Sequence, residues 1–241
     1  MGTTSATASE MQALQTQYHA TVHNLANANT AAYKRRLTVF SQALAQQLAS
    51  GSQDAPADEL VSASCRIYFS QGPLNRTDRP LDLAIEGDGF LVVETPTGPL
   101  YTRNGSLRTN TNGQLVDGGG RLVLGDSGQI TIPATAAMSK LNIAEDGTLS
   151  AAEQQLGKLR IVSFPDAAGL TPVGANCYTA GGQTPTPAKA KVRQGFIEQS
   201  NVKTVDELVG LITVSRMYEA NAKTLRIQDE RTQSLLQVAN A

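Results

Sequence analysis

The two ends of the chain carry matching helical patterns, and the stretch between them does not. Residues 9–36 and 204–239 both read as amphipathic helices with an apolar stripe. Nothing within either segment can bury its stripe, so each stripe requires the other terminus or another subunit. About 36 residues at ~1.5 Å per residue extend roughly 54 Å, which is too long for one small β domain to cover. The sequence therefore predicts a chain built to assemble.

The N-terminal pattern places Met11, Leu14, Tyr18, Thr21 or Val22, and Leu25 along one side of a helix, at spacings of three and four. We expect this helix to falter at residues 27–30, where Asn competes with the backbone for hydrogen bonds. The basic run at residues 34–36 would then lie near the negative end of the helix dipole, which is a sufficient explanation for its charge.

The C-terminal pattern begins with a predicted capping box, in which Thr204 is the N-cap and Glu207 lies three residues later. The stripe that follows has a 3-4 repeat with small residues at its centre, and this repeat favours a closely packed, coiled-coil-like partner. Its members are Leu208, Leu211 or Ile212, Ser215, Tyr218, Ala222 and Leu225.

Between the helices, residues 66–199 change to a period of two with glycine as punctuation. Leu83 and Ile85, and after Gly87–Gly89 also Phe90 and Val92, alternate as in a half-buried hairpin. Asn-Gly at 104 and 112 and Asp-Gly at 146 favour tight turns with positive φ. We expect a compact all-β domain of roughly ten short strands, with flanking N- and C-terminal helices that pack as a coiled-coil-like pair.

Sites for catalysis, cofactors or metals are not expected. His19 and His23 share a helix face, but Ala20 stands where a metalloprotease motif would carry Glu, and no third ligand is apparent. The glycine runs at 87–89 and 118–120 lack the Lys and Ser or Thr of a phosphate-binding loop. No Gly-x-Ser-x-Gly elbow occurs, so the sequence does not predict an enzyme.

Composition and targeting signals limit the classes of partner that the chain can be expected to bind. A net charge of −1 argues against nucleic acid or an anionic membrane, which require clustered cations. Residues 1–8 lack the charged and apolar regions of a cleaved secretory signal, and no stretch approaches the ~20 apolar residues of a membrane span. Cys65 and Cys177 could be two free thiols or one bridge, and the sequence does not decide between these states.

Several segments together resemble the bacterial flagellar rod and hook family. They follow the family's order along nearly the whole chain. They are Leu25–Thr30 with Tyr33–Arg35, Pro80–Phe90, Tyr101–Gly105, Gln114–Val116, Ser200–Val202 and Tyr218–Asn221.

The resemblance implies a structural axial subunit of the flagellar basal-body rod, which transmits torque toward the hook and performs no catalysis. It implies a periplasmic location and export through the flagellar type III apparatus without a cleaved signal peptide. Its expected partners are other rod and hook subunits and copies of itself, with no cofactor. The implied divisions are an assembly helix at 1–40, a linker at 41–65, an outer β domain at 66–199 and an assembly helix at 200–241.

Within the family, the length of the chain favours a rod protein of the longer type. The short segment from Ser41 to Ser64 favours the proximal rod over the distal rod, whereas residues 25–36 look more like the distal form. Ala31 and Ala32 depart from the family pattern, which has Gly immediately before the aromatic residue at position 33. The alternative function is a secreted β-domain binding protein or enzyme with a helical stalk.

The predicted assembly interface lies on the two terminal helices. Three of its asparagines, Asn24, Asn27 and Asn29, fall within six residues. They either cap the helix, which needs only one of them, or hold the chain against a neighbouring subunit, as the resemblance suggests. The interface residues are Leu14, Tyr18, Asn24, Leu25, Asn27, Asn29, Leu208, Leu211, Ile212, Tyr218, Asn221 and Leu225.

Overall fold

The structure, a computed structural model, describes residues 2–42, 61–133, 141–151 and 154–239. The chain forms two compact units that are interleaved in sequence. Unit 1 comprises Met1–Ala26, Arg36–Tyr68 and Lys203–Ala241, and unit 2 comprises Asn27–Arg35 and Phe69–Val202. The chain therefore crosses between the units four times, after residues 26, 35, 68 and 202.

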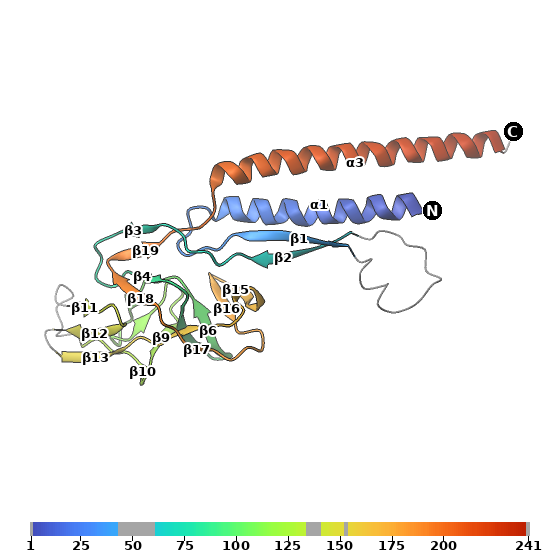
Figure 1. Ribbon diagram of the computed structural model, residues 1–241. Helices are drawn as coiled ribbons and strands as arrows, with labels where there is room; N and C mark the ends of the chain where they lie inside the picture. The colour runs from blue at the N-terminus through green and yellow to red at the C-terminus, as the bar shows by residue number, and fades with distance from the viewer. Residues whose placement is uncertain (1, 43–60, 134–140, 152–153, 240–241) are drawn as a thin grey trace. The chain divides into compact units, whose positions relative to one another are not determined.

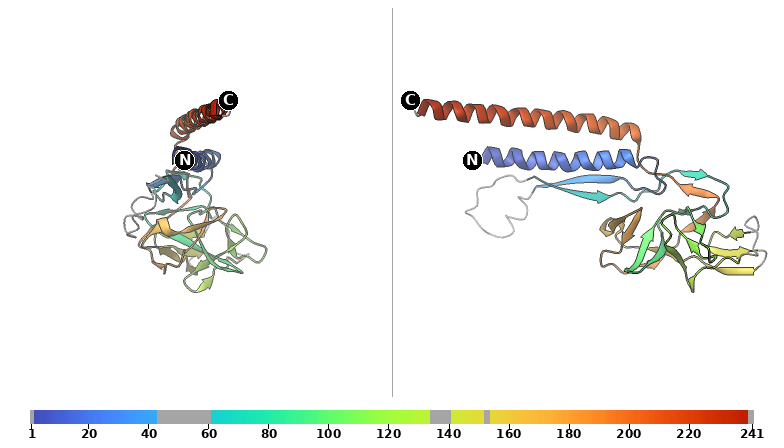
Figure 2. Two further views of the ribbon diagram at one scale, coloured as in Figure 1. Left: turned by 90° about the vertical axis from the view of Figure 1, so that its right-hand side faces the viewer. Right: turned by 180° about the vertical axis from the view of Figure 1, so that it is seen from behind.

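Unit 1 contains both long helices and one β-hairpin. The helices are α1 (Gly2–Ala26) and α3 (Thr204–Ala239), and the hairpin consists of β1 (Arg36–Gln42) and β2 (Val61–Ile67). Helix α1 contacts α3 and also both strands. The two chain termini lie at the same end of the helix pair, so α1 and α3 are antiparallel (Figures 1 and 2).

Helix α1 ends ten residues before the predicted limit at Arg36. The backbone oxygen of Asn27 accepts a hydrogen bond from the backbone nitrogen of Thr30 at 3.0 Å, which closes a turn after the last helical residue. Residues 36–42 then form a strand, with Thr38 opposite Cys65, because β-branched and aromatic residues favour extended backbone. Part of the predicted linker is thus a hairpin, and residues 43–60 lie outside the described residues.

Helix α3 begins at Thr204, the residue predicted as its cap, so the cap lies one residue earlier than predicted. The backbone nitrogen of Glu207 donates to the backbone oxygen of Lys203 at 3.1 Å, so Lys203 and not Thr204 accepts the first helical hydrogen bond. The acidic residues Asp206 and Glu207 lie in the first turn, at the positive end of the helix dipole. No helix among the described residues is both long and apolar enough to cross a membrane.

Unit 2 is built almost entirely from short strands, which confirms the predicted β-rich middle. The described part of the chain places more strands here than the ten expected, because many contain only two to four residues. Its elements are β3 (Leu74–Arg76), β4 (Leu83–Glu86), β5 (Phe90–Thr95), β6 (Gly98–Thr102), β7 (Arg108–Thr109), β8 (Leu115–Val116), β9 (Leu122–Gly125), β10 (Gly128–Gln129), β11 (Leu141–Ile143), β12 (Thr148–Ala151), β13 (Gln154–Lys158), β14 (Ile161–Ser163), η2 (Ala167–Gly169), β15 (Thr171–Gly174), β16 (Cys177–Thr179), β17 (Thr186–Pro187), β18 (Lys191–Gln194) and β19 (Phe196–Glu198).

The largest sheet has ten strands and encloses an aliphatic core. Its main path runs β15-β16-β6-β5-β9-β8-β7, with β10, β14 and β17 attached at the sides. The smaller sheets are β11-β12-β13, β18-β4 and β19-β3. Leu83, Leu91, Val93, Leu107 and Val123 are fully buried in the core that these strands share. This core makes unit 2 a packed β domain in its own right.

The predicted hairpin around Gly87–Gly89 is wrong. Strand β4 pairs with β18, and β5 pairs with β6, β9 and β14, so β4 and β5 are not partners. Both strands are buried over most of their length, which their apolar residues allow without any alternation. The turn between them is held by Arg103, as described below.

Candidate assembly interface

The contact between α1 and α3 is made by a narrow set of side chains. Leu14 and Thr21 of α1 and Val214 of α3 are buried, and Val214 is only 1% exposed. Gly210 lies beside Thr21, at an ordinary van der Waals separation from its methyl group. Leu211 and Leu225 are half-buried on the same side of α3.

Asn24 joins three of the four elements of unit 1 at one buried point. Its Nδ2 donates to the backbone oxygen of Arg36 at 2.9 Å, and its Oδ1 accepts from the backbone nitrogen of Arg36 at 2.8 Å. The same Nδ2 donates to Oε2 of Glu207 at 3.2 Å. Asn24 and Glu207 are both almost fully buried. One amide therefore fastens the end of α1 to the start of β1 and to the first turn of α3.

The other two asparagines near the end of α1 have different surroundings. Asn27 forms the turn that follows α1, and its Oδ1 accepts from the hydroxyl of Thr30 at 3.2 Å. Asn29 is exposed and Leu25 is half-buried. The three asparagines thus do not form one cluster within the chain.

Several predicted interface residues lie outside the α1–α3 contact. Tyr18 of α1 is 41% exposed, and Leu208, Ile212 and Tyr218 of α3 are 43%, 56% and 44% exposed. Asn221 lies closer than these residues to the side of α3 that faces α1, and it is half-buried. Because a helix turns 100° per residue, α3 can present only one side to α1 and leaves its other apolar residues uncovered. The predicted set thus divides into residues that are covered within the chain and residues that remain exposed.

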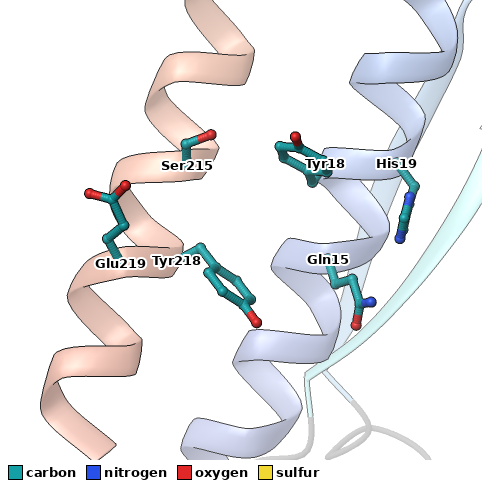
Figure 3. Close-up of a pocket in the computed structure, with 6 residues that line it drawn as sticks. All are labelled: Gln15, Tyr18, His19, Ser215, Tyr218 and Glu219. Atoms are coloured by element: carbon teal, nitrogen blue, oxygen red, sulfur yellow. The ribbon is translucent and has the colours of Figure 1, made fainter. Parts of the chain in front are cut away.

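A groove of about 370 Å³ runs between the two helices beyond their closest approach. It is lined by Gln15, Tyr18 and His19 from α1 and by Ser215, Tyr218 and Glu219 from α3. Figure 3 shows Tyr18 and Tyr218 reaching from opposite helices toward the space between them. We call this feature the tyrosine groove.

In unit 2, a buried ion cluster ties together distant parts of the chain. Nζ of Lys34 lies 2.6 Å from Oε1 of Glu198 and donates to the backbone oxygen of Ser70 at 2.7 Å. Nε of Arg103 lies 3.0 Å from the second carboxylate oxygen of Glu198. Burial lowers the pKa of Lys34 to about 8, against the opposing effect of the Glu198 charge.

Sequence reasoning missed this cluster. It assigned Lys34 to the end of the first helix, but the helix has already ended at Ala26 and the ammonium group is fully buried. Glu198 also accepts from the backbone nitrogen of Gly72 at 2.8 Å, so its charge is fully engaged. The available signal was the position of Lys34 and Arg103 inside segments that resemble the rod and hook family.

Arg103 also determines the shape of the turn between β4 and β5. Its guanidinium donates to the backbone oxygens of Ile85, Gly87 and Gly89 at 2.9–3.3 Å. The guanidinium thus satisfies three backbone carbonyls along a turn that is exposed at Gly87 and buried at Gly89. The rigid fork of Arg matches this fan of acceptors, which Lys could not do.

The described residues hold no group of three or more His, Cys, Asp and Glu side chains that could bind a metal ion. Both cysteines are free, with Cys65 exposed and Cys177 buried. The alternative of a disulfide between them is therefore not realised. Partial desolvation of Cys65 and burial of Cys177 raise the pKa of their thiols, which reduces their reactivity.

Known proteins share both the middle of this chain and its C-terminal helix. Residues 84–151 match the family described as flagellar hook protein FlgE/F/G D1 domain, and residues 193–238 match flagellar basal body rod FlgEFG protein C-terminal. The flagellar basal-body rod protein FlgG of Buchnera aphidicola subsp. Acyrthosiphon pisum is 31% identical over 90% of this chain and 91% of its own length. FlgG of Bacillus subtilis is 32% identical over 95% of both chains. The chain belongs to the flagellar basal-body rod protein family.

Membership of the rod protein family accounts for the β-rich middle of the chain and for its long C-terminal helix. The family is structural, so the chain is a rod subunit and not an enzyme. The family's C-terminal segment covers most of α3, including Leu208, Ile212 and Tyr218. FlgF of Caulobacter vibrioides is also similar, at 32% identity over 95% of this chain and 94% of its own length. Both FlgG and FlgF proteins thus resemble the chain along nearly its full length.

Proposed function

We propose that this rod protein assembles through its terminal helices. Helices α1 and α3 pack as a coiled-coil-like pair, and their uncovered apolar residues contact the helices of neighbouring rod subunits. This proposal rests on the exposure of Leu208 and Ile212, which lie on a helix of a structural rod protein. Large aliphatic side chains that are uncovered in one chain gain free energy when a neighbour covers them.

The proposed interface retains the residues expected from the sequence, with two roles. Leu14, Asn24, Leu211 and Leu225 shape the helix pair itself, which the neighbour recognises. The others offer side chains to the neighbour directly or lie at the end of α1, and they are Tyr18, Leu25, Asn27, Asn29, Leu208, Ile212, Tyr218 and Asn221.

The rod context suggests the wider role of the chain. We propose that its partners include the flagellar export apparatus as well as rod and hook subunits, and that it lies in the periplasmic part of the rod. Torque then passes toward the hook through the packed helices. The β-rich region at 66–199 faces outward, between the assembly segments at 1–40 and 200–241 and beyond the linker at 41–65.

Electron microscopy of basal bodies from a strain lacking this protein tests the function. Rods should be truncated, with no hook attached, and a plasmid copy should restore them. The length of the truncated rod also separates the proximal from the distal position, because a proximal subunit stops growth earlier. The preference for the proximal rod stays a prediction, since the names FlgG and FlgF do not state a position. Complete rods and hooks in the deletion strain would contradict the proposed function.

A further inference from the structure

Helix α3 carries a second uncovered surface, on the side away from α1. Val205, Val209 and Ile212 are 71%, 59% and 56% exposed. At 100° per residue these positions lie about 140–180° around the helix from Val214, which is buried against α1. We call this surface the valine stripe. It cannot be covered by the same contact that covers Val214.

The valine stripe has the form of a ligand for a groove between two helices. Its members are separated by four and three residues, which is the spacing of an apolar seam that inserts between neighbouring helices. The tyrosine groove of the same unit offers two aromatic side chains, Tyr18 and Tyr218, that are each more than 40% exposed (Figure 3). Both surfaces are therefore apolar at their centres and partly uncovered.

The charges at the edges of the two surfaces are complementary. Arg216 is exposed one turn beyond Ile212 and continues the valine stripe. Glu219 is exposed at the edge of the tyrosine groove. The net charge of −1 leaves little general repulsion between two copies of the chain.

We propose that the valine stripe of one subunit docks in the tyrosine groove of a second copy of this chain. This inference rests on the proposed function and names the surfaces through which its helices meet. The two surfaces are different parts of one molecule, so the contact is head-to-tail, and every added subunit presents a new groove or a new stripe. Such a contact generates an open helical assembly when its rotation does not close into a ring, whereas a self-complementary patch would stop at a dimer.

Cysteine crosslinking in intact cells tests this pairing. The chain carries Tyr18→Cys together with Val209→Cys in a Cys65→Ser background, and it replaces the native protein. A thiol oxidant is then added, and the products are separated by size under non-reducing conditions. We expect a ladder of dimers, trimers and larger species in steps of 25.4 kDa. Each single variant should give at least tenfold less dimer, because its thiol meets a residue that is not cysteine.

Matched variants distinguish this pairing from nonspecific crosslinking and from a failure to fold. Thr224→Cys, exposed about four turns further along α3, replaces Val209→Cys as a control and should abolish the ladder when combined with Tyr18→Cys. A second pair, Gln15→Cys with Val205→Cys, covers the case in which the first pair does not fold or assemble. Gln15 is exposed in the groove, and Val205 is the most exposed member of the stripe.

The outcomes separate the inference from the proposed function. Dimers from either single variant would show a symmetric contact and overturn the inference. A crosslinked band that is not a multiple of 25.4 kDa would show a different protein in the groove and would also overturn it. Absence of a ladder from both pairs, in cells whose basal bodies contain the chain, would overturn the head-to-tail pairing and leave the rod function intact. Only complete rods without the chain would remove the function itself.

Discussion

Asn24 uses both hydrogens and the oxygen of its amide on partners that belong to different elements. Its removal would leave the backbone of Arg36 and the carboxylate of Glu207 short of partners in a buried place. A buried polar group without a partner is destabilising by about 1–3 kcal/mol. Asn24 is therefore one asparagine of the run whose contribution to stability follows from contacts within the chain.

Single substitutions of the three asparagines should have unequal effects. We expect Asn24→Ala to destabilise unit 1 by about 2 kcal/mol, because it removes three hydrogen bonds from a buried place. Asn24→Asp should destabilise it by about 3 kcal/mol, since it places a second buried carboxylate beside Glu207. The exposed Asn29→Ala should change stability by less than about 0.5 kcal/mol. Thermal unfolding followed by circular dichroism at the helical band measures these differences.

Motility distinguishes a capping role of the asparagine run from an interface role. If Asn27→Ala or Asn29→Ala impairs rod assembly while helicity is unchanged, those side chains hold a neighbouring subunit. If only one of the three substitutions impairs assembly and it lowers helicity to the same extent, a role within the chain is sufficient.

Lys34 should give unit 2 a distinctive pH dependence. Its pKa in the folded chain, about 8, lies below the value near 10.4 of an unfolded lysine. Between these two values the unfolded chain binds more protons, so the contribution of Lys34 to stability rises with pH by roughly 1 kcal/mol per pH unit. Below pH 8 the ammonium group is charged in both states and the full burial penalty remains.

Urea unfolding at several pH values between 7.5 and 10 checks this expectation. The matched control is Lys34→Met with Glu198→Gln, which removes the titrating amine without leaving the carboxylate charged and unpaired. Groups that titrate in both proteins cancel in the difference between the two slopes. Parallel dependences on pH would contradict the assigned burial of a charged Lys34.

One departure from the family pattern has a physical meaning that the sequence alone could not give. Ala32 adopts φ of +55°, the left-handed conformation that glycine accepts most readily, and it is fully buried. The sequence indicated an unusual residue before Tyr33, but only the structure shows that the backbone still makes the turn. The backbone nitrogen of Ala32 donates to the backbone oxygen of Glu198 at 2.8 Å, which helps to hold this conformation.

At the scale of elements, the two faces of α3 should respond differently to charge. Leu208→Asp should change the stability of the isolated chain by less than about 0.5 kcal/mol, because Leu208 is 43% exposed there. It should nevertheless abolish swimming, since a carboxylate buried in an assembled interface is destabilising by several kcal/mol. Leu225→Asp should impair swimming and also weaken the α1–α3 pair, because Leu225 is half-buried within the chain.

Thr224→Asp provides the control for both leucine variants, since Thr224 is exposed on another side of the helix. Soft-agar motility measures assembly, and thermal unfolding of unit 2 verifies that the β core is unchanged. Normal swimming by Leu208→Asp and Leu225→Asp would remove these residues from the proposed interface.

The elements that the sequence predicted well are those determined by local pattern. Helix α3 was predicted within one residue because a 3-4 repeat and acidic first turn act over short distances. The hairpin at 83–92 was wrong because strand pairing depends on distant residues. Strand β4 pairs with residues 191–194, more than 100 positions away, and Arg103 holds the intervening turn. Similarly, nothing in the local sequence of Lys34 indicates that Glu198 is its partner.

At the scale of the whole molecule, unit 2 is discontinuous in sequence. Residues 27–35 belong to it although they precede the β-rich stretch, and they supply Lys34 to the ion cluster. A fragment limited to the predicted domain at 66–199 would therefore retain Glu198 and Arg103 but lose Lys34. The predicted boundary and the observed unit lead to different expectations for a shortened chain.

Comparison of two fragments tests the boundary. We expect residues 27–202 to be more stable than residues 66–199 by about 3 kcal/mol, because the shorter fragment leaves a buried carboxylate with fewer partners. Urea unfolding of the two purified fragments measures the difference. Equal stability would show that residues 27–35 contribute nothing to the fold of the β unit.

The intact monomer should also be protected unevenly from proteases. Its amphipathic helices have uncovered apolar faces and gain little stability alone, whereas unit 2 has a closed core. Limited proteolysis followed by mass spectrometry should leave a resistant core that contains residues 69–202. Early protection of residues 9–30 in dilute monomer would contradict this expectation.

The four points at which the chain passes between the two units affect how a rotating rod carries mechanical load. Three of them are fastened together inside unit 2. Asn201 accepts from the backbone nitrogen of Arg35 at 2.7 Å and donates to the backbone oxygen of Ser70 at 3.0 Å. Lys34 bonds the same Ser70 oxygen. A pulling force applied to any one of these three chain segments is shared with the other two. The hydrogen bonds are therefore loaded in parallel and must break together.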